Sequence, residues 1–202
     1  MGYGVGTVTS PRTGLGVGGE SMKLKNPDDF WKLLKKEFDR WWGDNTERKY
    51  SAFEDITQRT CLMIPLLVTF GKNNDYHVET EAYPHIDVGY YSNCTKSEWA
   101  KWSFEVAIEH ENKPYPNWHE ECSKLMAINA GLKVLISYYS ETNECLNNEI
   151  NEFLSIYESR KYHQKDDKYL FVFIPFDKFN ETDKYSVYEF SDKGLQKIQI
   201  GR

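Results

Sequence analysis

Acidic side chains alternate along residues 104–113, which read FEVAIEHENK. In an extended strand, successive side chains point to opposite faces of the sheet. One face would carry the odd-numbered residues of this segment, which are Glu105, Ala107, Glu109, Glu111 and Lys113. The other face would carry Val106, Ile108 and His110. His110 is therefore expected to be packed or hydrogen-bonded in the interior rather than to act as a base.

A further acid lies upstream, because Asp87 falls inside the segment Ile86-Asp87-Val88, which also alternates like a strand. Carboxylates on neighbouring strands can turn toward one divalent cation, and Mg²⁺ prefers oxygen ligands of this kind. Acids that share a face about 7 Å apart repel one another unless a cation neutralises them. The pattern of Asp87 and Glu109 therefore predicts a Mg²⁺ site, which Mn²⁺ can also fill.

Hydrolysis of a phosphodiester at neutral pH is the chemistry that such a site would serve. The reaction needs a nucleophilic water, neutralisation of charge on the phosphoryl oxygens, and help for the leaving oxygen. Lys113, on the acidic side of an extended strand, would position the water or neutralise developing charge.

These residues resemble the motif of the PD-(D/E)xK nuclease superfamily. The resemblance covers roughly residues 50 to 175 and consists of Asp87, the strand with Glu109-His110-Glu111, and the helix and strand that follow. In that family an acid on each of two successive strands binds the metal, which implies Asp87 and Glu109 as ligands. An acid from an N-terminal helix often joins them, and Glu54 is the matching position here. The family motif has a Pro directly before the first acid, whereas Pro84 stands three residues before Asp87.

The third position of the family motif, usually Lys, falls here on Glu111. This arrangement looks like the Glu-x-Glu variant of some restriction endonucleases, and we adopt it. In the alternative register Glu111 is the ligand and Lys113 is the lysine, which places the motif against Pro114 at the end of the strand. The resemblance implies a Mg²⁺-dependent endonuclease acting on DNA, with Asp87, Glu109, Glu111 and Lys113 as the catalytic positions.

The length, charge and cysteine content of the chain narrow the class of protein to which it can belong. The 202 residues are enough for one ordinary domain, and 15% aromatic residues indicate a folded chain. The formal charge of −6 disfavours non-specific coating of nucleic acid but permits a local basic groove. Four scattered cysteines, without a CxxC pair, predict free thiols in the cytoplasm. No run approaches the roughly 18 apolar residues of a membrane span, and no secretory signal is expected from the first residues of the sequence.

Residues 1–22 are rich in glycine and are expected to form a flexible arm or leader, ahead of a single domain over residues 23–202. A helix should begin at the N-cap Asn26 and end near Gly43. A second helix is expected from Tyr50 to Thr69, interrupted near Pro65, with Glu54 and Asp55 turned toward the core. Two roles stay open for Lys124, in a later helix: a contact with phosphate, or an ordinary surface lysine, which we favour.

The rest of the chain reads as strands with two intervening helices. Strands are expected over 76–83, 86–91, 101–112, 133–139, 169–175, 185–190 and 196–200, and helices over 119–130 and 144–162. Antiparallel strands followed by alternating helix and strand predict an α/β fold with a mixed sheet flanked by helices on both faces.

Two other functions remain open from the sequence. The scaffold of a nuclease can persist in a catalytically inactive regulatory or interaction protein, because fold alone does not guarantee activity. A metal-dependent hydrolase of small phosphoesters or nucleotides is the third alternative. A nuclease that cuts both strands of a duplex usually has two active sites, so a homodimer is expected for that function, and no membrane partner is expected.

Overall fold

The computed structural model describes residues 26–44, 55–82, 85–91, 104–112, 118–139, 145–159, 166–191 and 193–199. The expected arm of residues 1–22 lies outside these ranges. The described helices are α1 (Pro27–Gly43), α3 (Ile56–Asn73), α4 (Trp118–Ala127) and α5 (Cys145–Ser159), with a short 3₁₀ turn at Thr182–Lys184. The strands are β1 (His77–Ala82), β2 (Ile86–Tyr91), β3 (Phe104–His110), β4 (Ala130–Tyr139), β5 (Tyr169–Pro175), β6 (Ser186–Ser191) and β7 (Gly194–Lys197).

The seven described strands form one sheet in the order in which they follow along the chain, from β1 to β7. β3, β4 and β5 are parallel to one another, whereas the other neighbouring pairs are antiparallel. The protein therefore has an α/β fold with a mixed, open sheet, which confirms the predicted class at this level.

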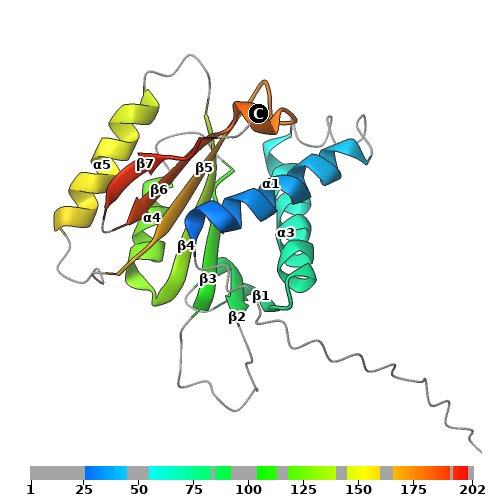
Figure 1. The fold of residues 1–202 in the computed structure, drawn as a ribbon, viewed down its shortest axis with the longest axis horizontal. Coiled ribbons are helices and arrows are strands. Elements are labelled where there is room, and N and C mark those ends of the chain that lie inside the picture. The colour runs from blue at the N-terminus through cyan, green and yellow to red at the C-terminus, as the bar shows by residue number, and fades with distance from the viewer. Residues whose placement is uncertain are drawn as a thin grey trace, which may run out of the picture.

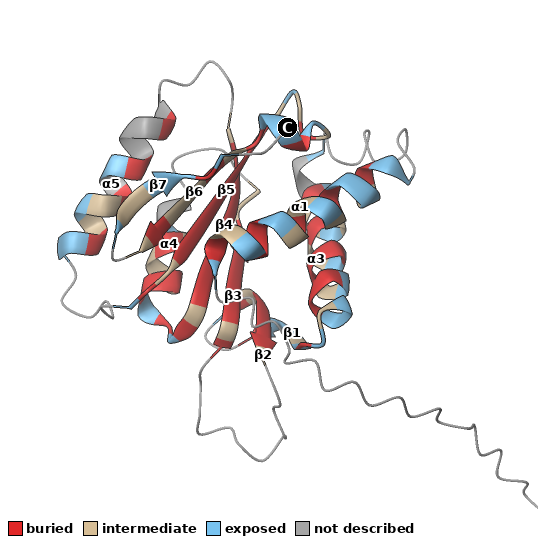
Figure 2. Ribbon diagram, in the orientation of Figure 1, coloured by how far each residue is buried: buried red, intermediate tan, exposed pale blue. Residues whose placement is uncertain are grey.

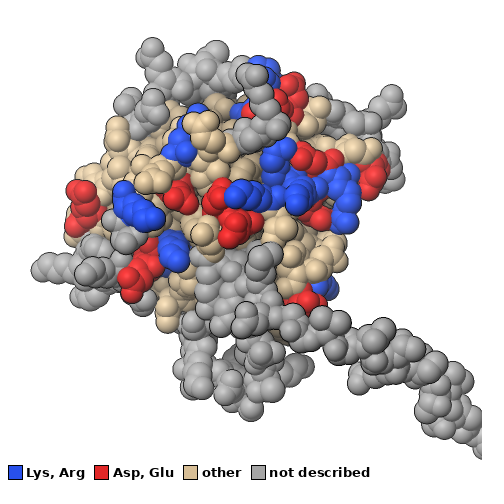
Figure 3. Space-filling model, in the orientation of Figure 1, with Lys and Arg blue, Asp and Glu red and all other residues tan. Residues whose placement is uncertain are grey.

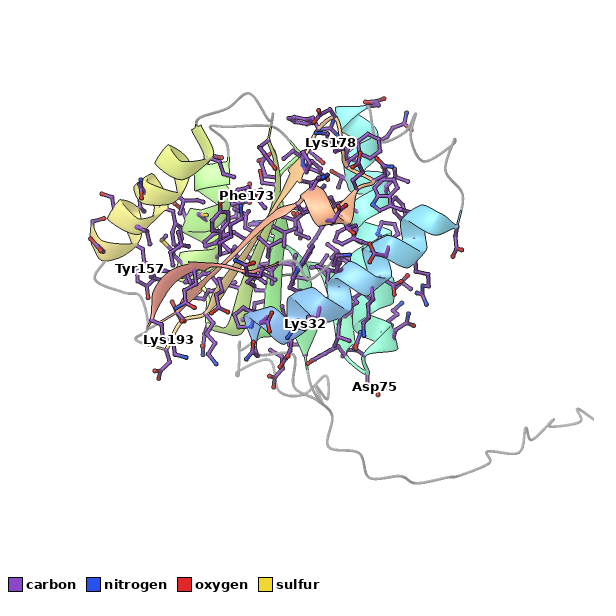
Figure 4. All side chains as sticks on the ribbon, turned by 45° about the horizontal axis from the view of Figure 1, so that its top comes forward. Lys32, Asp75, Tyr157, Phe173, Lys178 and Lys193 are labelled. Carbon is purple, nitrogen blue, oxygen red and sulfur yellow. The ribbon has the colours of Figure 1, made fainter. Side chains whose placement is uncertain are left out.

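Helices cover both faces of the sheet (Figure 1). α4 joins β3 to β4, and α5 joins β4 to β5. Both crossovers advance in the same direction across the sheet, so right-handed connections place α4 and α5 on the same face. α1 and α3 pack on the opposite face. In Figure 4, Tyr157 of α5 lies at the left of the molecule and Lys32 of α1 near its lower centre.

The alternation of side chains along the strands creates two separate hydrophobic cores. Figure 2 shows that the inner strands of the sheet consist mostly of buried residues. Val106 and Ile108 of β3 pack with residues of α1 and α3. Ala107, between them in sequence, packs on the other face with residues of α4 and α5. The central strand β5 is buried along its whole length, as expected for a strand covered on both faces.

α1 begins where the sequence predicts. The side chain of Asn26 accepts hydrogen bonds from the main-chain N–H groups of Asp28, at 2.9 Å, and Asp29, at 3.4 Å. Pro27 occupies the first helical position, where its missing N–H costs no hydrogen bond.

The prediction that Pro65 interrupts the second helix is wrong, because α3 runs through it without a break. A proline inside a helix removes the hydrogen bond to the carbonyl of the residue four positions earlier, here Cys61. Both Pro65 and Cys61 are exposed, so water can solvate that carbonyl. The expectation that Asp55 turns toward the core is also wrong, since Asp55 is exposed just before the helix.

The bounds of β2 and β5 agree with the sequence prediction, whereas the end of α4 and the start of β4 do not. The helix ends at Ala127, and Ala130 and Gly131 already belong to the strand. Ala130 pairs with Phe104 of β3, and the Phe104 N–H donates to the carbonyl of Asn129, 3.1 Å away. Pairing with β3 therefore starts the strand where the sequence suggested the end of a helix. None of the described helices is long and apolar enough to cross a membrane.

Candidate active site

Asp87 and Glu109 are opposite one another on neighbouring strands. The antiparallel register of β2 and β3 pairs Val88 with Ile108 and Gly89 with Ala107. Continuing this register by one residue brings Asp87 level with Glu109. Both side chains belong to the face that α4 covers, as the strand alternation predicts.

The backbone next to Glu109 holds Asp87 in place. The main-chain N–H of His110 donates a hydrogen bond of 2.8 Å to Oδ2 of Asp87. Burial raises the pKa of the Asp87 carboxyl above its ordinary value, while the His110 N–H and the Glu109 side chain act in the opposite direction. Asp87 is thus a partly buried acid with a fixed orientation.

Glu109 is the most buried acid of the group, with 0% of its surface exposed. Neither of its carboxylate oxygens forms a well-oriented hydrogen bond with a described residue. Burial raises the pKa of Glu109 far above its usual range, and the charges of Asp87 and Glu121 raise it further. Glu109 therefore carries a proton at neutral pH unless a cation stabilises its charge.

Two residues of α4 also belong to this cluster: Glu121, which the sequence analysis did not consider, and Lys124, for which a phosphate contact was the less favoured alternative. Glu121 and Lys124 form an ion pair on the helix, and both act electrostatically on Asp87 and Glu109. Burial opposes the charge on Lys124, but Glu121, Glu109 and Asp87 outweigh it and raise the Lys124 pKa. Lys124 is at the surface, as expected, with 38% of its side chain exposed, but its charge also acts on the acidic cluster.

Of the other three predicted site residues, Glu111 is among the described residues, whereas Glu54 and Lys113 are not. Glu111 follows β3, is partly buried, and its main-chain N–H donates to the Ile136 carbonyl at 2.9 Å. The pKa values of Asp87 and Glu109 are shifted by these two acids acting on one another and by Glu121 and Lys124 of α4.

His110 points to the opposite face, as predicted. Its Nε2 lies 2.7 Å from the hydroxyl of Tyr138 in the interior. Burial and the nearby charge of Arg59 lower the His110 pKa to about 3, so the imidazole is neutral at physiological pH. The Arg59 guanidinium lies over the rings of Tyr138 and Phe176, at 4.9 Å and 4.5 Å from their centroids. The buried cluster of His110, Tyr138, Arg59 and Phe176 thus holds the end of β3 on the face opposite Asp87 and Glu109.

A strained residue lies on the other side of Asp87. The register of β1 and β2 pairs Thr80 with Val88 and Ala82 with Ile86, which brings Glu81 level with Asp87. Glu81 has a φ of 52°, in the left-handed region that is unfavourable for residues other than glycine. The hydrogen-bonded ladder is locally disturbed beside the first acid of the cluster.

The acidic cluster offers few oxygen donors for a metal ion. Within the described ranges no three His, Cys, Asp or Glu side chains gather closely enough to hold one ion. Asp87 and Glu109 nevertheless suit Mg²⁺, because this ion commonly binds one or two carboxylates and keeps several waters. The buried carboxyl of Glu109 interacts with the acids Asp87 and Glu121, and a cation would offset the repulsion among these groups.

A second buried charged group lies on the α5 side of the sheet. Lys133 donates to Oδ2 of Asp167 over 2.7 Å, and their side chains are only 1% and 3% exposed. The hydroxyl of Tyr169 also donates to Asp167, at 3.2 Å. Because these groups satisfy one another, they are a structural ion pair rather than an open site.

Charge on the face shown in Figure 3 is mixed. Lysine and arginine side chains gather over α1, but acidic side chains lie among them. Lys32 is paired with Asp28, and Lys35 with Asp39 at 2.8 Å. This part of the surface is not a continuous basic groove.

Comparisons of the chain with protein-family models, with curated proteins and with solved structures found no match. The functional assignment therefore depends on the arrangement of Asp87, Glu109, Glu121 and Lys124.

Proposed function

We propose that the protein is a Mg²⁺-dependent endonuclease of the restriction-endonuclease-like class, which hydrolyses phosphodiester bonds of DNA. The observation that carries this proposal is that Asp87 lies level with Glu109 when the register of β2 and β3 is continued by one residue, is held by the His110 N–H, and has a fully buried Glu109 carboxyl beside it. A mixed sheet with helices on both faces agrees with the fold that the PD-(D/E)xK resemblance implies. The two acids lie on successive strands, as that motif requires.

Asp87 and Glu109 would hold the cation. Bound Mg²⁺ would neutralise charge on the phosphoryl oxygens and lower the pKa of a coordinated water. The His110 N–H orients Asp87, and the burial of Glu109 keeps competing water away from its carboxylate. Glu111 stays the proposed third group, while Glu54 and Lys113 keep the roles that the resemblance implies.

Substrate and assembly follow from the proposed chemistry. DNA is the proposed substrate because the motif resembles that of DNA nucleases. A homodimer is the proposed form for cleavage of both strands. The cytoplasm is the proposed compartment, in line with the free thiols of Cys61 and Cys122.

Plasmid DNA incubated with the protein and Mg²⁺ or Mn²⁺ tests this proposal. Cleavage by the wild type should fall by at least about a hundredfold in Asp87→Ala and Glu109→Gln, because each loses a metal-binding carboxylate. Asp177→Asn, at an exposed aspartate, is the matched control and should cleave like the wild type. Cleavage that survives in Asp87→Ala would reject the assigned roles.

A catalytically inactive regulatory or interaction protein is the second candidate function. It is favoured by the absence, within the described residues, of a third metal-binding side chain beside Asp87 and Glu109. Calorimetric titration with Mn²⁺ separates the two candidates, since an inactive scaffold that has lost its site would bind no metal. Parallel assays with small phosphoesters and nucleotides test the third, hydrolase alternative.

A further inference from the structure

The alternation of side chains along β3 continues for two residues beyond the end of the strand at His110. The side chain of Asn112 lies on the α3 face, where its Nδ2 donates a hydrogen bond to the hydroxyl of Thr60. Neighbouring residues of an extended chain point to opposite faces. Glu111 is therefore directed to the α4 face, like Glu109 two residues before it.

Arg59 of α3 holds the same segment through the main chain. Its Nη1 donates a hydrogen bond of 3.3 Å to the carbonyl of Asn112. Arg59 is only 5% exposed, and its guanidinium lies over the rings of Tyr138 and Phe176. A planar guanidinium stacked on two rings has few other orientations, so its direction toward Asn112 is fixed.

Glu111 is thus supported on two sides. Its own main-chain N–H donates to the carbonyl of Ile136 in β4, at 2.9 Å, and the next residue is held by α3. Burial of a guanidinium costs free energy, and an apolar side chain would serve the packing of α3 at least as well. The hydrogen bond to the end of β3 is what Arg59 adds at this position.

We propose that Arg59 is a positioning residue of the active site, which holds the main chain at Asn112 so that the Glu111 carboxylate stays on the α4 face. Arg59 touches neither the cation nor DNA and acts only through the backbone, from the opposite face of the sheet. Thr60 assists it by holding the Asn112 side chain. The inference deepens the proposed nuclease function and rests on it. Because a shift of about 1 Å in a catalytic group can lower a rate about a hundredfold, even a slight loosening of this segment matters.

Amide hydrogen exchange of the full-length protein without metal, followed by NMR, tests whether Arg59 holds the segment. Arg59→Met keeps a long side chain but loses the donor. In this variant the Glu111 N–H should exchange about fivefold faster, as the loss of one hydrogen bond predicts. The amides of the central strand β5 should keep their exchange rates, because the effect is local. Lys72→Met, at an exposed lysine of α3, is the matched control and should change neither.

Cleavage of a short DNA duplex in Mn²⁺ tests whether the position of Glu111 matters for the reaction. Arg59→Met should lower kcat by about ten- to a hundredfold, while KM changes by less than about twofold because Arg59 contacts no substrate. Thr60→Val removes the hydroxyl that accepts from Asn112 and should shift kcat and Glu111 exchange in the same direction. Thr60→Ser keeps that hydroxyl and should restore both values.

The outcomes separate this inference from the proposed function. If the wild type cleaves DNA, but folded Arg59→Met has an unchanged kcat or an unchanged Glu111 exchange rate, the positioning role is overturned and the nuclease proposal stands. Equal acceleration of exchange in β5 also overturns it, since Arg59 would then stabilise the whole fold.

Circular dichroism establishes that each variant is folded. Should Arg59→Met not fold, the Thr60 variants decide, and a Thr60→Val protein that behaves like Thr60→Ser overturns the inference. A wild type that neither binds Mn²⁺ nor cleaves DNA overturns the proposed function, and the positioning role with it.

Discussion

The main-chain N–H of His110 donates a hydrogen bond to the carboxylate of Asp87, 2.8 Å away. This peptide group directly follows Glu109, so one contact fixes both acids relative to each other. The imidazole of the same residue is anchored on the opposite face of the sheet by Tyr138. The orientation of the acidic pair is thus coupled to packing in the other core.

Asp87→Asn and Asp87→Ala separate the charge of Asp87 from its hydrogen bond. Asparagine still offers a carbonyl oxygen to the His110 N–H, so Asp87→Asn should be at least as stable as the wild type. Asp87→Ala leaves that N–H without its acceptor and should lose about 1 kcal/mol in the free energy of unfolding. Both variants should lose Mn²⁺ binding. Urea unfolding and calorimetry are the measurements, and equal stability of the two variants would contradict the role of the hydrogen bond.

The wild type should lose stability as pH rises because of the buried Glu109, and Glu109→Gln should abolish this loss. The folded protein keeps a proton on Glu109 that the unfolded chain releases above about pH 4.5, the ordinary pKa of the group. The folded state therefore loses stability as pH rises from that value toward the raised folded-state pKa. Between pH 5 and pH 8, without metal, the stability of Glu109→Gln relative to the wild type should increase by about 1–3 kcal/mol.

Urea unfolding at both pH values measures this change. Glu79→Gln, at an exposed acid of β1, is the matched control and should show no comparable trend. A pH-independent difference between Glu109→Gln and the wild type would mean that Glu109 is ionised in the folded state.

Glu81→Gly should relieve the strained backbone beside Asp87. Glycine adopts a positive φ without the steric cost that a side chain brings, so this variant should be about 1 kcal/mol more stable than Glu81→Ala. Both variants remove the same exposed carboxylate, so their difference isolates the backbone effect. Thermal unfolding measures it, and equal melting temperatures would show that Glu81 is not strained.

Lys133→Met should be strongly destabilising, because it leaves the buried carboxylate of Asp167 without its partner. Loss of one member of such a pair costs about 3–5 kcal/mol. Lys133→Met combined with Asp167→Leu removes both charges and should recover part of that loss. Chemical unfolding of the single and double variants gives the coupling energy. If the double variant loses as much stability as the two single variants together, or more, Lys133 and Asp167 do not stabilise each other.

The sequence was sufficient to predict the pairing of Asp87 and Glu109, since alternation along a strand determines the face and successive antiparallel strands tend to be neighbours. It was not sufficient to place Glu121 beside these acids, and for Lys124 it raised only a phosphate contact, as the less favoured alternative. Their approach to the acids depends on how α4 is rotated over β3 and β4, which is set by tertiary packing. A lysine and a glutamate three residues apart otherwise resemble any exposed helical ion pair.

The buried pair of Lys133 and Asp167 was missed for a related reason. Lys133 begins a run of apolar residues, and its partner is 34 residues away, beyond the reach of any local pattern. The effect of Pro65 was overestimated because the cost of a helical proline depends on whether water reaches the carbonyl left unpaired, and exposure cannot be deduced from the residue type alone.

The consecutive order of the strands in the sheet also bears on how the chain assembles. As the polypeptide leaves the ribosome, each described strand finds its predecessor already synthesised and can add to the free edge of the growing sheet. No late strand has to insert between two that are already paired, so few premature pairings need to be undone. Pairing between strands that follow one another in sequence favours rapid folding, and it shortens the time that aggregation-prone, partly folded intermediates are exposed.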